Sequence, residues 1–475
     1  MISVYRLGYH DRVGQSGGII CQTMPDRATP SSFSEQLADP EQLGMCPTRL
    51  GRVTDWLNQQ IDGERLAGAS VLIGRRGALG YFAAAGHADR QSKTQFSRDT
   101  LVRIFSMTKP VTTVAAMMLY EQGAFQLDDP VAKYLPVFAD TRVWMGGDSD
   151  LASTLPQDSP MTVRHRMTHT AGLTYGFMHT NLVDAAYRKN GVEFPGADGD
   201  LETWIDRLAE LPLICQPGSQ WNYSVATDVL GRLVEVWSGR SLEEYFASAI
   251  FEPLGMSSTG FHVAPENHHL FASLYGPEHG GDMSSVAATT VDSSDSSTQQ
   301  RGGLRQLESG ADSRYLQPTQ LYSGGGGLVG SINDYARFAQ MLLNDGVLEG
   351  SRLLSPSTIR FMRANQLPDN RDMAAMGQPV WSETSYDGIG FGLGWAVVLD
   401  PVKAHMVASV GEHHWGGAAS TFFWLDPAEE LFTVFFTQLM RPLPTLFAES
   451  CAPGSIRRSR IECLATVKRH QSTEL

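Results

Sequence analysis

The sequence contains a serine and a lysine at a spacing that supports nucleophilic catalysis. Ser106-Met107-Thr108-Lys109 opens a stretch of helical periodicity, and a three-residue step places the Ser106 hydroxyl and the Lys109 amine on one helix face. A serine alcohol is a weak nucleophile at neutral pH and needs a base beside it. The start of a helix also offers backbone N–H groups to an oxyanion. The tetrapeptide predicts a nucleophile for acyl chemistry, although taken alone it also fits a plain helix start with an exposed lysine.

Two later segments carry groups that such a nucleophile would need. Tyr223 lies in a loop just ahead of a predicted helix, and a phenol beside an ammonium can take up and return a proton. Residues 415–418 read Trp-Gly-Gly-Ala before a predicted strand, and residues without a Cβ let a substrate pass close to the backbone. Taken singly, the tyrosine also fits a buried aromatic residue and the glycine pair a plain turn. Together, the segments predict one shared site.

The three segments resemble the signature elements of the serine β-lactamase-like superfamily, in its esterase branch, the family VIII carboxylesterases. In this sequence the elements are Ser106-Met107-Thr108-Lys109-Pro110, Tyr223-Ser224-Val225 and Trp415-Gly416-Gly417. The resemblance spans roughly residues 47 to 440, with supporting stretches at 127–130, 168–173, 250–256, 323–327 and 335–338. It implies a β-lactamase/transpeptidase-like α+β fold, in which a mainly antiparallel β-sheet is flanked by helices and a mostly helical domain is inserted.

The resemblance implies a covalent acyl-enzyme route. Ser106 would attack a carbonyl carbon, Lys109 would hold and help to deprotonate Ser106, and Tyr223 would act as general base and then as acid. Which of Lys109 and Tyr223 takes the first proton stays open, because the two groups would titrate as a coupled pair. The backbone N–H groups of Ser106 and Ala418 would form the oxyanion hole, where one donor is typically worth about 2.7 to 4 kcal/mol.

Two departures from the β-lactamase pattern point to the substrate class. Trp415-Gly416-Gly417 stands where β-lactamases usually carry Lys-Thr-Gly, and Val225 stands where many carry the amide of Tyr-x-Asn. Both changes remove polar groups that would recognise an acidic β-lactam or a peptide, whereas a neutral ester needs only nucleophile, base and oxyanion hole. We therefore expect a small-molecule ester as substrate. The residues expected to line its pocket are Trp415, Gly416, Gly417, Tyr175 and His414.

Three other functions stay open at this stage. An acyltransferase would use the same acyl-enzyme with an alcohol or amine in place of water. A weak β-lactamase or a D-alanyl peptidase would use the same nucleophile. A protein that kept the fold as a silent binding module is disfavoured, because Ser106, Lys109 and Tyr223 are all present.

The composition excludes several classes of partner. The chain has 51 acidic and 37 basic residues and a net charge of −14, which repels nucleic acid and anionic membranes. No histidine or cysteine spacing matches a metal site, and we expect neither metal nor cofactor. Without an apolar stretch of about 20 residues or a secretory signal, the chain is expected to be cytoplasmic. The oligomeric state is left open.

The elements that must position these residues alternate along the chain. Strand-like runs occur at 69–74 and 80–86 and again at 395–399, 406–410, 421–425 and 431–437, with a predicted helix at 50–61 before them. Strands at both ends around a helical middle predict one discontinuous α/β domain with an insertion. The glycine run 324–327 lacks a following Lys-Ser or Lys-Thr, so it predicts a tight backbone passage near the site and no phosphate loop.

The expected domain organisation follows from these runs. Residues 47–123 and 330–440 form the discontinuous α/β sheet domain, and residues 124–329 form the helical domain with a flexible insertion at about 276–313. Residues 1–46 are expected to be a poorly ordered N-terminal extension. Residues 441–475 form an atypical, proline-containing C-terminal tail where a long amphipathic helix would be expected from the resemblance.

Overall fold

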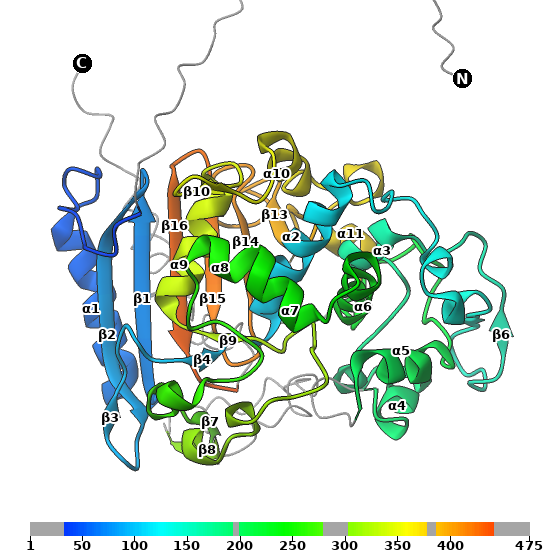
Figure 1. Cartoon of the computed structure of the whole chain (residues 1–475), viewed down its shortest axis with the longest axis horizontal. Coiled ribbons are helices and arrows are strands. Elements are labelled where there is room, and N and C mark those ends of the chain that lie inside the picture. The colour runs from blue at the N-terminus through cyan, green and yellow to red at the C-terminus, as the bar shows by residue number, and fades with distance from the viewer. Residues whose placement is uncertain (1–32, 193–198, 279–302, 378–385, 441–475) are drawn as a thin grey trace, which may run out of the picture.

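The computed structural model describes residues 33–192, 199–278, 303–377 and 386–440. Its main feature is an eight-stranded antiparallel sheet in the order β12-β13-β14-β15-β16-β1-β2-β3 (Figure 1). The strands are β1 (Gly68–Arg75), β2 (Ala78–Asp89), β3 (Thr94–Gln95), β12 (Ile389–Phe391), β13 (Ala396–Val398), β14 (His413–Gly416), β15 (Phe422–Asp426) and β16 (Leu431–Thr437). The predicted α+β class with a mainly antiparallel sheet is confirmed.

Short strand pairs and helices make up the rest of the described chain. The pairs are β4 (Val102–Arg103) with β9 (Val329–Gly330), β5 (Val143–Trp144) with β6 (Thr154–Leu155), β7 (Leu274–Pro277) with β8 (Leu304–Glu308), and β10 (Val347–Leu348) with β11 (Ser351–Arg352). The helices are α1 (Pro47–Asp62), α2 (Thr108–Glu121), α3 (Val163–Met167), α4 (Leu182–Lys189), α5 (Leu201–Ala209), α6 (Ala226–Ser238), α7 (Leu242–Phe246), α8 (Glu252–Leu254), α9 (Ile332–Leu343), α10 (Pro356–Met362) and α11 (Met373–Met376). None of the helices within the described ranges combines the length and apolar character needed to cross a membrane.

Helices α1 and α9 cover the sheet, because each of them presents an apolar face to its strands. The predicted helix at 50–61 is α1, which starts with Pro47 and buries Leu50, Val53 and Leu57 against β1 and β2. Burying each of these side chains contributes about 1.5 to 3 kcal/mol. Helix α9 packs on β1, β15 and β16 and belongs to the larger core cluster.

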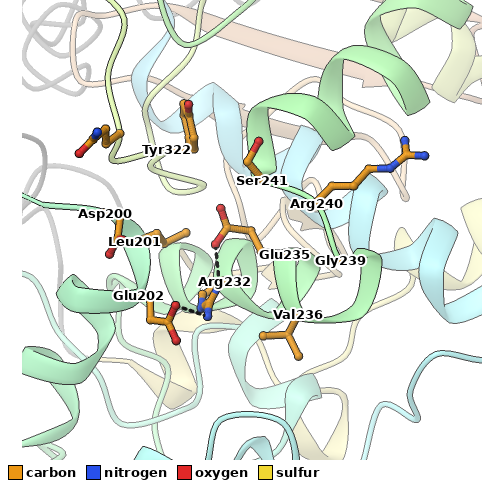
Figure 2. A pocket seen from close by; sticks show the side chains of 11 residues that line it. Asp200, Leu201, Glu202, Arg232, Glu235, Val236, Gly239, Arg240, Ser241 and Tyr322 are labelled. Atoms are coloured by element: carbon orange, nitrogen blue, oxygen red, sulfur yellow. Dashed lines mark hydrogen bonds and ion pairs between the residues drawn. The ribbon is translucent and has the colours of Figure 1, made fainter.

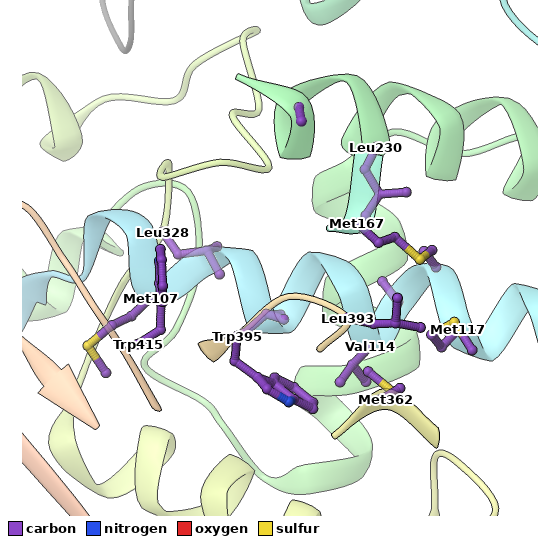
Figure 3. Packing of buried hydrophobic residues seen from close by; sticks show 14 of the residues in the cluster. Met107, Val114, Met117, Met167, Leu230, Leu328, Met362, Leu393, Trp395 and Trp415 are labelled. Carbon is purple, nitrogen blue, oxygen red and sulfur yellow. The ribbon is translucent and has the colours of Figure 1, made fainter. Parts of the chain in front are cut away.

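Helix α2 runs through the interior of the molecule. Its side chains are buried around most of its circumference, with Val114 and Met117 packed among Leu393 and Trp395 (Figure 3). Helix α6 lies alongside it. Because α2 is packed tightly on several sides, the residues at its start are held in fixed positions.

The expected disorder of residues 1–46 is wrong for their last third. Residues 1–32 lie outside the described range, but Phe33, Leu43 and Met45 are buried. A Cβ added to Gly80 in β2 would lie 1.9 Å from the Met45 methyl carbon, so the glycine leaves room for this side chain. Leu43 and Met45 belong to the apolar cluster between α1 and the sheet, whereas Phe33 belongs to the larger core cluster.

Two other expectations about segments need correction. Residues 406–410 form no strand, because a turn at 401–405 leads into them and leaves Val407 and Val410 exposed. The predicted flexible insertion at 276–313 has an ordered end: β8 pairs with β7, and two 3₁₀ turns follow it. Residues 279–302 and the C-terminal tail 441–475 lie outside the described ranges.

Candidate active site

Ser106 lies at the junction between a strand and a helix. Strand β4 leads through Ile104 to Phe105, which adopts a φ of +43°. A left-handed conformation is costly for a residue with a Cβ, on the order of 1 to 3 kcal/mol. The turn carries the chain into the 3₁₀ segment Phe105–Met107 and then α2, and it leaves Ser106 half-buried while Met107 is buried.

Lys109 joins three parts of the chain. Its Nζ donates hydrogen bonds to Ser106 Oγ at 3.2 Å, to Tyr175 Oη at 2.9 Å and to Gly325 O at 2.7 Å. The side chain is 1% exposed, and its Nζ lies 4.7 Å from the centre of the Tyr223 ring. The predicted contact between Ser106 and Lys109 is therefore present, and the ammonium has three oxygen partners.

Tyr223 reaches the same serine from the loop before α6. Its Oη donates a hydrogen bond to Ser106 Oγ at 2.6 Å, and the residue is 4% exposed. The loop is fixed by backbone hydrogen bonds from Trp221 N to Met376 O and from Asn222 N to His169 O, each at 2.8 Å. Two of the predicted segments thus meet at one oxygen atom, within ordinary hydrogen-bonding distance.

Tyr175 was expected to line the substrate pocket, but it contacts Lys109 directly. Its Oη accepts from Lys109, its ring centre is 5.1 Å from that of Tyr223, and Phe177 stacks on it at 4.6 Å. Burial raises the pKa of the Tyr175 phenol well above its usual value, and Tyr223 acts in the same direction. Tyr175 therefore stays neutral and serves as a hydrogen-bonding partner of the lysine.

The third predicted segment lies against the turn that carries the serine. A Cβ on Gly417 would come within 2.3 Å of Ile104 O, so only glycine permits this approach. Gly417 N donates to Thr421 O, whereas within the described chain the N–H of the neighbouring Ala418 donates to no acceptor. Gly416 ends β14 just before this close contact. The Ala418 N–H is thus available to an oxyanion.

Strand β14 separates two residues that were predicted to share the pocket. Trp415 faces the site, with its ring centre 5.4 Å from that of Tyr223 and 5.3 Å from that of Phe391. Successive side chains of a strand point to opposite faces. His414 therefore lies on the other face, where its ring is 5.6 Å from that of Phe422. The structure does not bring His414 to Ser106, because the segment forms a strand whose side chains alternate between the two faces of the sheet.

Asp228 and the glycine run were not recognised as partners of the lysine. Asp228 is 4% exposed, and its Oδ1 accepts from Ser323 Oγ at 2.5 Å and from Gly325 N at 3.0 Å. Burial raises the pKa of Asp228, and the Lys109 charge opposes this rise. The prediction of a tight backbone passage at 324–327 is confirmed, because a Cβ on Gly325 would lie 2.4 Å from Asp228 Oδ2.

His169 is a second buried polar residue that the sequence did not assign to the site. Its Nδ1 lies 3.2 Å from Ser224 Oγ, and its ring centre is 5.1 Å from that of Tyr223. Burial lowers its pKa well below 6.5, and the charge of Lys109 adds to the effect. The ring is therefore neutral and packs against the ring of Tyr223. The only available signal was its place in the stretch 168–173, which supports the family resemblance but has no residue spacing that marks a catalytic role.

This arrangement can perform acyl chemistry. An alcohol oxygen that is partly open to solvent receives one hydrogen bond from an ammonium and one from a phenol, in surroundings that are otherwise aromatic. Both donors can move protons to and from that oxygen. Among the described residues, no group of three His, Cys, Asp or Glu side chains is arranged to hold a metal ion.

A separate pocket of about 480 Å³ lies between α5, α6 and the start of α7 (Figure 2). Two of its acidic side chains pair with the same arginine, since Arg232 lies 2.8 Å from Glu202 and 3.1 Å from Glu235. None of the predicted catalytic residues lines it. The lining residues are Asp200, Leu201, Glu202, Arg232, Glu235, Val236, Gly239, Arg240, Ser241, Gln320 and Tyr322.

Comparisons with known proteins agree with this geometry. A family model described as Beta-lactamase matches residues 53–449. Esterase EstB of Burkholderia gladioli is 32% identical over 401 residues, which cover 82% of this chain and 89% of EstB. Acyltransferase calJ of Penicillium decumbens is 29% identical over 349 residues, covering 72% and 76% of the two chains. The solved structure of EstCE1, described as a hydrolase with promiscuous acyltransferase activity, matches with a TM-score of 0.68 at 28% identity, covering 90% of this chain and 99% of EstCE1.

Proposed function

We propose a function for this chain from one premise: the chain belongs to the Beta-lactamase family. It acts as a serine hydrolase that cleaves small carboxylic esters through an acyl-enzyme on Ser106. The observation that carries this proposal is the pair of hydrogen bonds on one oxygen atom, from Tyr223 Oη at 2.6 Å and from Lys109 Nζ at 3.2 Å. The similarity to esterase EstB supports the choice of an ester.

The reaction follows from these contacts. For the reaction the Tyr223 and Lys109 pair must hold one proton fewer than an ammonium and a phenol together, as a phenolate beside an ammonium or a phenol beside an amine. Ser106 Oγ then attacks the ester carbonyl while its proton passes to this pair. The carbonyl oxygen becomes an oxyanion, which the backbone N–H groups of Ser106 and Ala418 stabilise. When the tetrahedral intermediate collapses, the Tyr223 phenol donates a proton to the departing alkoxide. Water then enters and attacks the acyl carbonyl while the same pair takes its proton. The pair returns that proton to Ser106 Oγ as the acid is released, which restores the starting state.

The substrate is expected to be uncharged and apolar around its carbonyl group. Aromatic rings surround Tyr223. Its ring centre lies 5.1 Å from that of Tyr175, 5.4 Å from that of Trp415 and 6.4 Å from that of Trp221. The Phe391 ring packs against Trp221, with the two centres 5.6 Å apart. Lys109, the cation beside the serine, already donates to three oxygen atoms. The surroundings therefore favour an apolar acyl group over the carboxylate of a β-lactam.

Acyl transfer is the second candidate function. The similarity to acyltransferase calJ and to EstCE1 supports it, since both are described by this activity. The acylation half-reaction is the same, and the two functions differ only in whether water or an alcohol accepts the acyl group from Ser106.

The test is a panel of p-nitrophenyl esters and nitrocefin with the wild type and Ser106→Ala, with intact mass used to detect the acyl-enzyme. Ester turnover and a mass increase on wild type alone are expected. Equal turnover in both proteins would reject the mechanism. A labelled wild type that turns over only after an alcohol is added would establish acyl transfer in place of hydrolysis.

A further inference from the structure

Two arginines in the described part of the chain have no exposed surface, and their surroundings differ. Arg103 and Arg166 are each 0% exposed. Arg103 donates to Glu308 Oε1 at 2.9 Å and to Ala272 O at 2.8 Å, so a carboxylate and backbone oxygen compensate its charge. This is the usual arrangement, because an unpaired buried charge costs several kcal/mol.

Arg166, on α3, has no such compensation. Its Nε, Nη1 and Nη2 are all buried, and no described group accepts a hydrogen bond from them. The Phe138 ring lies 4.9 Å from the guanidinium carbon. This ring contact contributes about 0.5 to 2 kcal/mol through its π face, but it leaves the N–H donors without acceptors. Burial lowers the pKa of Arg166 to about 9, so the group still carries its charge at neutral pH.

Tyr187, the ionisable neighbour of Arg166, supplies a second hydrogen-bond donor and no negative charge. Tyr187, on α4, interacts electrostatically with Arg166. The Thr174 backbone N–H can only donate to the buried Tyr187 Oη, and no described group accepts the proton of this hydroxyl. The acidic residue on the same helix, Asp184, is directed elsewhere: it accepts from Thr174 Oγ1 at 2.6 Å and from Thr180 Oγ1 at 2.8 Å. Asp184 acts on Tyr187 only through its charge, so among the described residues no carboxylate forms a hydrogen bond with either Arg166 or Tyr187.

We propose that a small inorganic anion of the size of chloride binds between the Arg166 guanidinium and the Tyr187 hydroxyl. A single negative charge matches the single uncompensated positive charge, and N–H and O–H donors are the groups that solvate a halide. A halide is favoured over phosphate or a carboxylate ligand because the site has no exposed surface and because a multivalent anion would leave an excess negative charge.

The site is structural and is joined to the active site along the chain. Helix α3 ends at Met167, and the chain from there leads to Tyr175, whose hydroxyl contacts Lys109. An anion at Arg166 would stabilise the packing of α3 against its neighbours and take no part in the reaction.

The experiment compares thermal unfolding of the full chain as chloride replaces gluconate at constant ionic strength. We expect a saturable rise in Tm, since an anion at 100 times its Kd multiplies the folding equilibrium constant about 100-fold. The variant Arg166→Met should lose this dependence. The control variant Arg164→Met, in which a half-buried arginine on the same helix loses its contact with Asp128, should retain it. Crystals soaked in bromide should show an anomalous peak beside Arg166.

The outcome that overturns the proposal is a Tm that is equal in chloride and gluconate together with no bromide peak at the guanidinium. Internal water would then solvate Arg166. If Arg166→Met does not fold, the wild-type titration and the bromide peak still decide. Neither measurement depends on ester turnover, so the result is independent of the proposed function.

Discussion

Replacing Gly325 by alanine should lower the catalytic rate of Ser106, although the substitution leaves the serine itself unchanged. A Cβ at this position would lie 2.4 Å from Asp228 Oδ2, whereas ordinary contacts begin at 3.4 Å, so about 1 Å of movement is required. The carboxylate is held by Ser323 Oγ at 2.5 Å and cannot easily yield. The peptide group of residue 325 must therefore shift. Its carbonyl oxygen then loses the 2.7 Å hydrogen bond that it accepts from Lys109 Nζ.

The expected loss follows from this displacement. A misplacement of about 1 Å in a catalytic group costs roughly 100-fold in rate, which is about 2.7 kcal/mol of barrier. The overlap inside the protein should also lower the free energy of unfolding by about 1 to 3 kcal/mol. Gly325 has no positive φ, so the effect is steric and does not come from backbone strain.

The assay is kcat/KM on a p-nitrophenyl ester, with the rate of acylation followed by quenched-flow mass spectrometry. Gly51→Ala is the control, because this α1 glycine has no neighbouring atom within 4 Å of an added Cβ. It should keep full activity and gain about 0.5 to 1 kcal/mol of stability. A folded Gly325→Ala protein with wild-type kcat/KM would refute the reasoning that this carbonyl positions Lys109.

The remaining predictions concern the two phenols and a buried histidine. Tyr223→Phe should lower kcat/KM about 10²- to 10⁴-fold, because the proton carrier on Ser106 is removed; a loss below tenfold would move the acid/base role to another group. Tyr175→Phe removes one of three oxygen partners of Lys109 and should cost about 10- to 100-fold; unchanged kinetics would make its phenol a bystander. Burial lowers the pKa of His413 to about 4 from 6.5, so the unfolded chain binds more protons between these values. Stability from this group is complete above pH 6.5 and is lost as the pH falls toward 4, by roughly 3 kcal/mol. His413→Asn should flatten the curve of Tm against pH in that window, and parallel curves for both proteins would contradict this assignment.

The local sequence was sufficient to predict the helix start that carries Ser106 and Lys109 and several strands of the sheet. The three-residue step from Ser106 to Lys109 needs only helix geometry, and the structure places the two groups 3.2 Å apart. The alternating and β-branched runs gave β1, β2, β15 and β16 with small errors at their ends. These elements are set by their own periodicity, so the surrounding fold did not need to be known.

The partners of the lysine depend on distant contacts that periodicity does not encode. Tyr175 was assigned to a pocket wall because its loop follows a familiar stretch, but 66 residues separate it from the lysine that it contacts. Asp228 looked like an ordinary acidic residue in the first turn of a helix. Its burial against Gly325 follows from the packing of α6 beside α2, which requires the whole tertiary structure.

The four-residue strand β14 is a second feature that could not be predicted from the local sequence. Residues 413–416 include a histidine pair and a glycine, and they lack the β-branched residues that mark a strand. A shift of one residue in such a segment exchanges the two faces of the sheet. His414 was therefore expected beside Trp415 in the site, although alternation sends the two side chains in opposite directions.

Strand β1 lies inside the sheet between two other strands, and this position affects how the chain folds while it is being synthesised. Its neighbours are β2, which follows at once, and β16, and the hydrogen bond from Thr437 Oγ1 to Gly68 O joins residues 369 positions apart. At about 5 to 20 residues per second, a ribosome needs roughly 20 to 75 s to deliver the second neighbour. During that time the emerging hairpin presents an unpaired edge that can aggregate. Chaperones that bind nascent chains should therefore raise the soluble yield of this protein, and products that terminate before β16 should be insoluble.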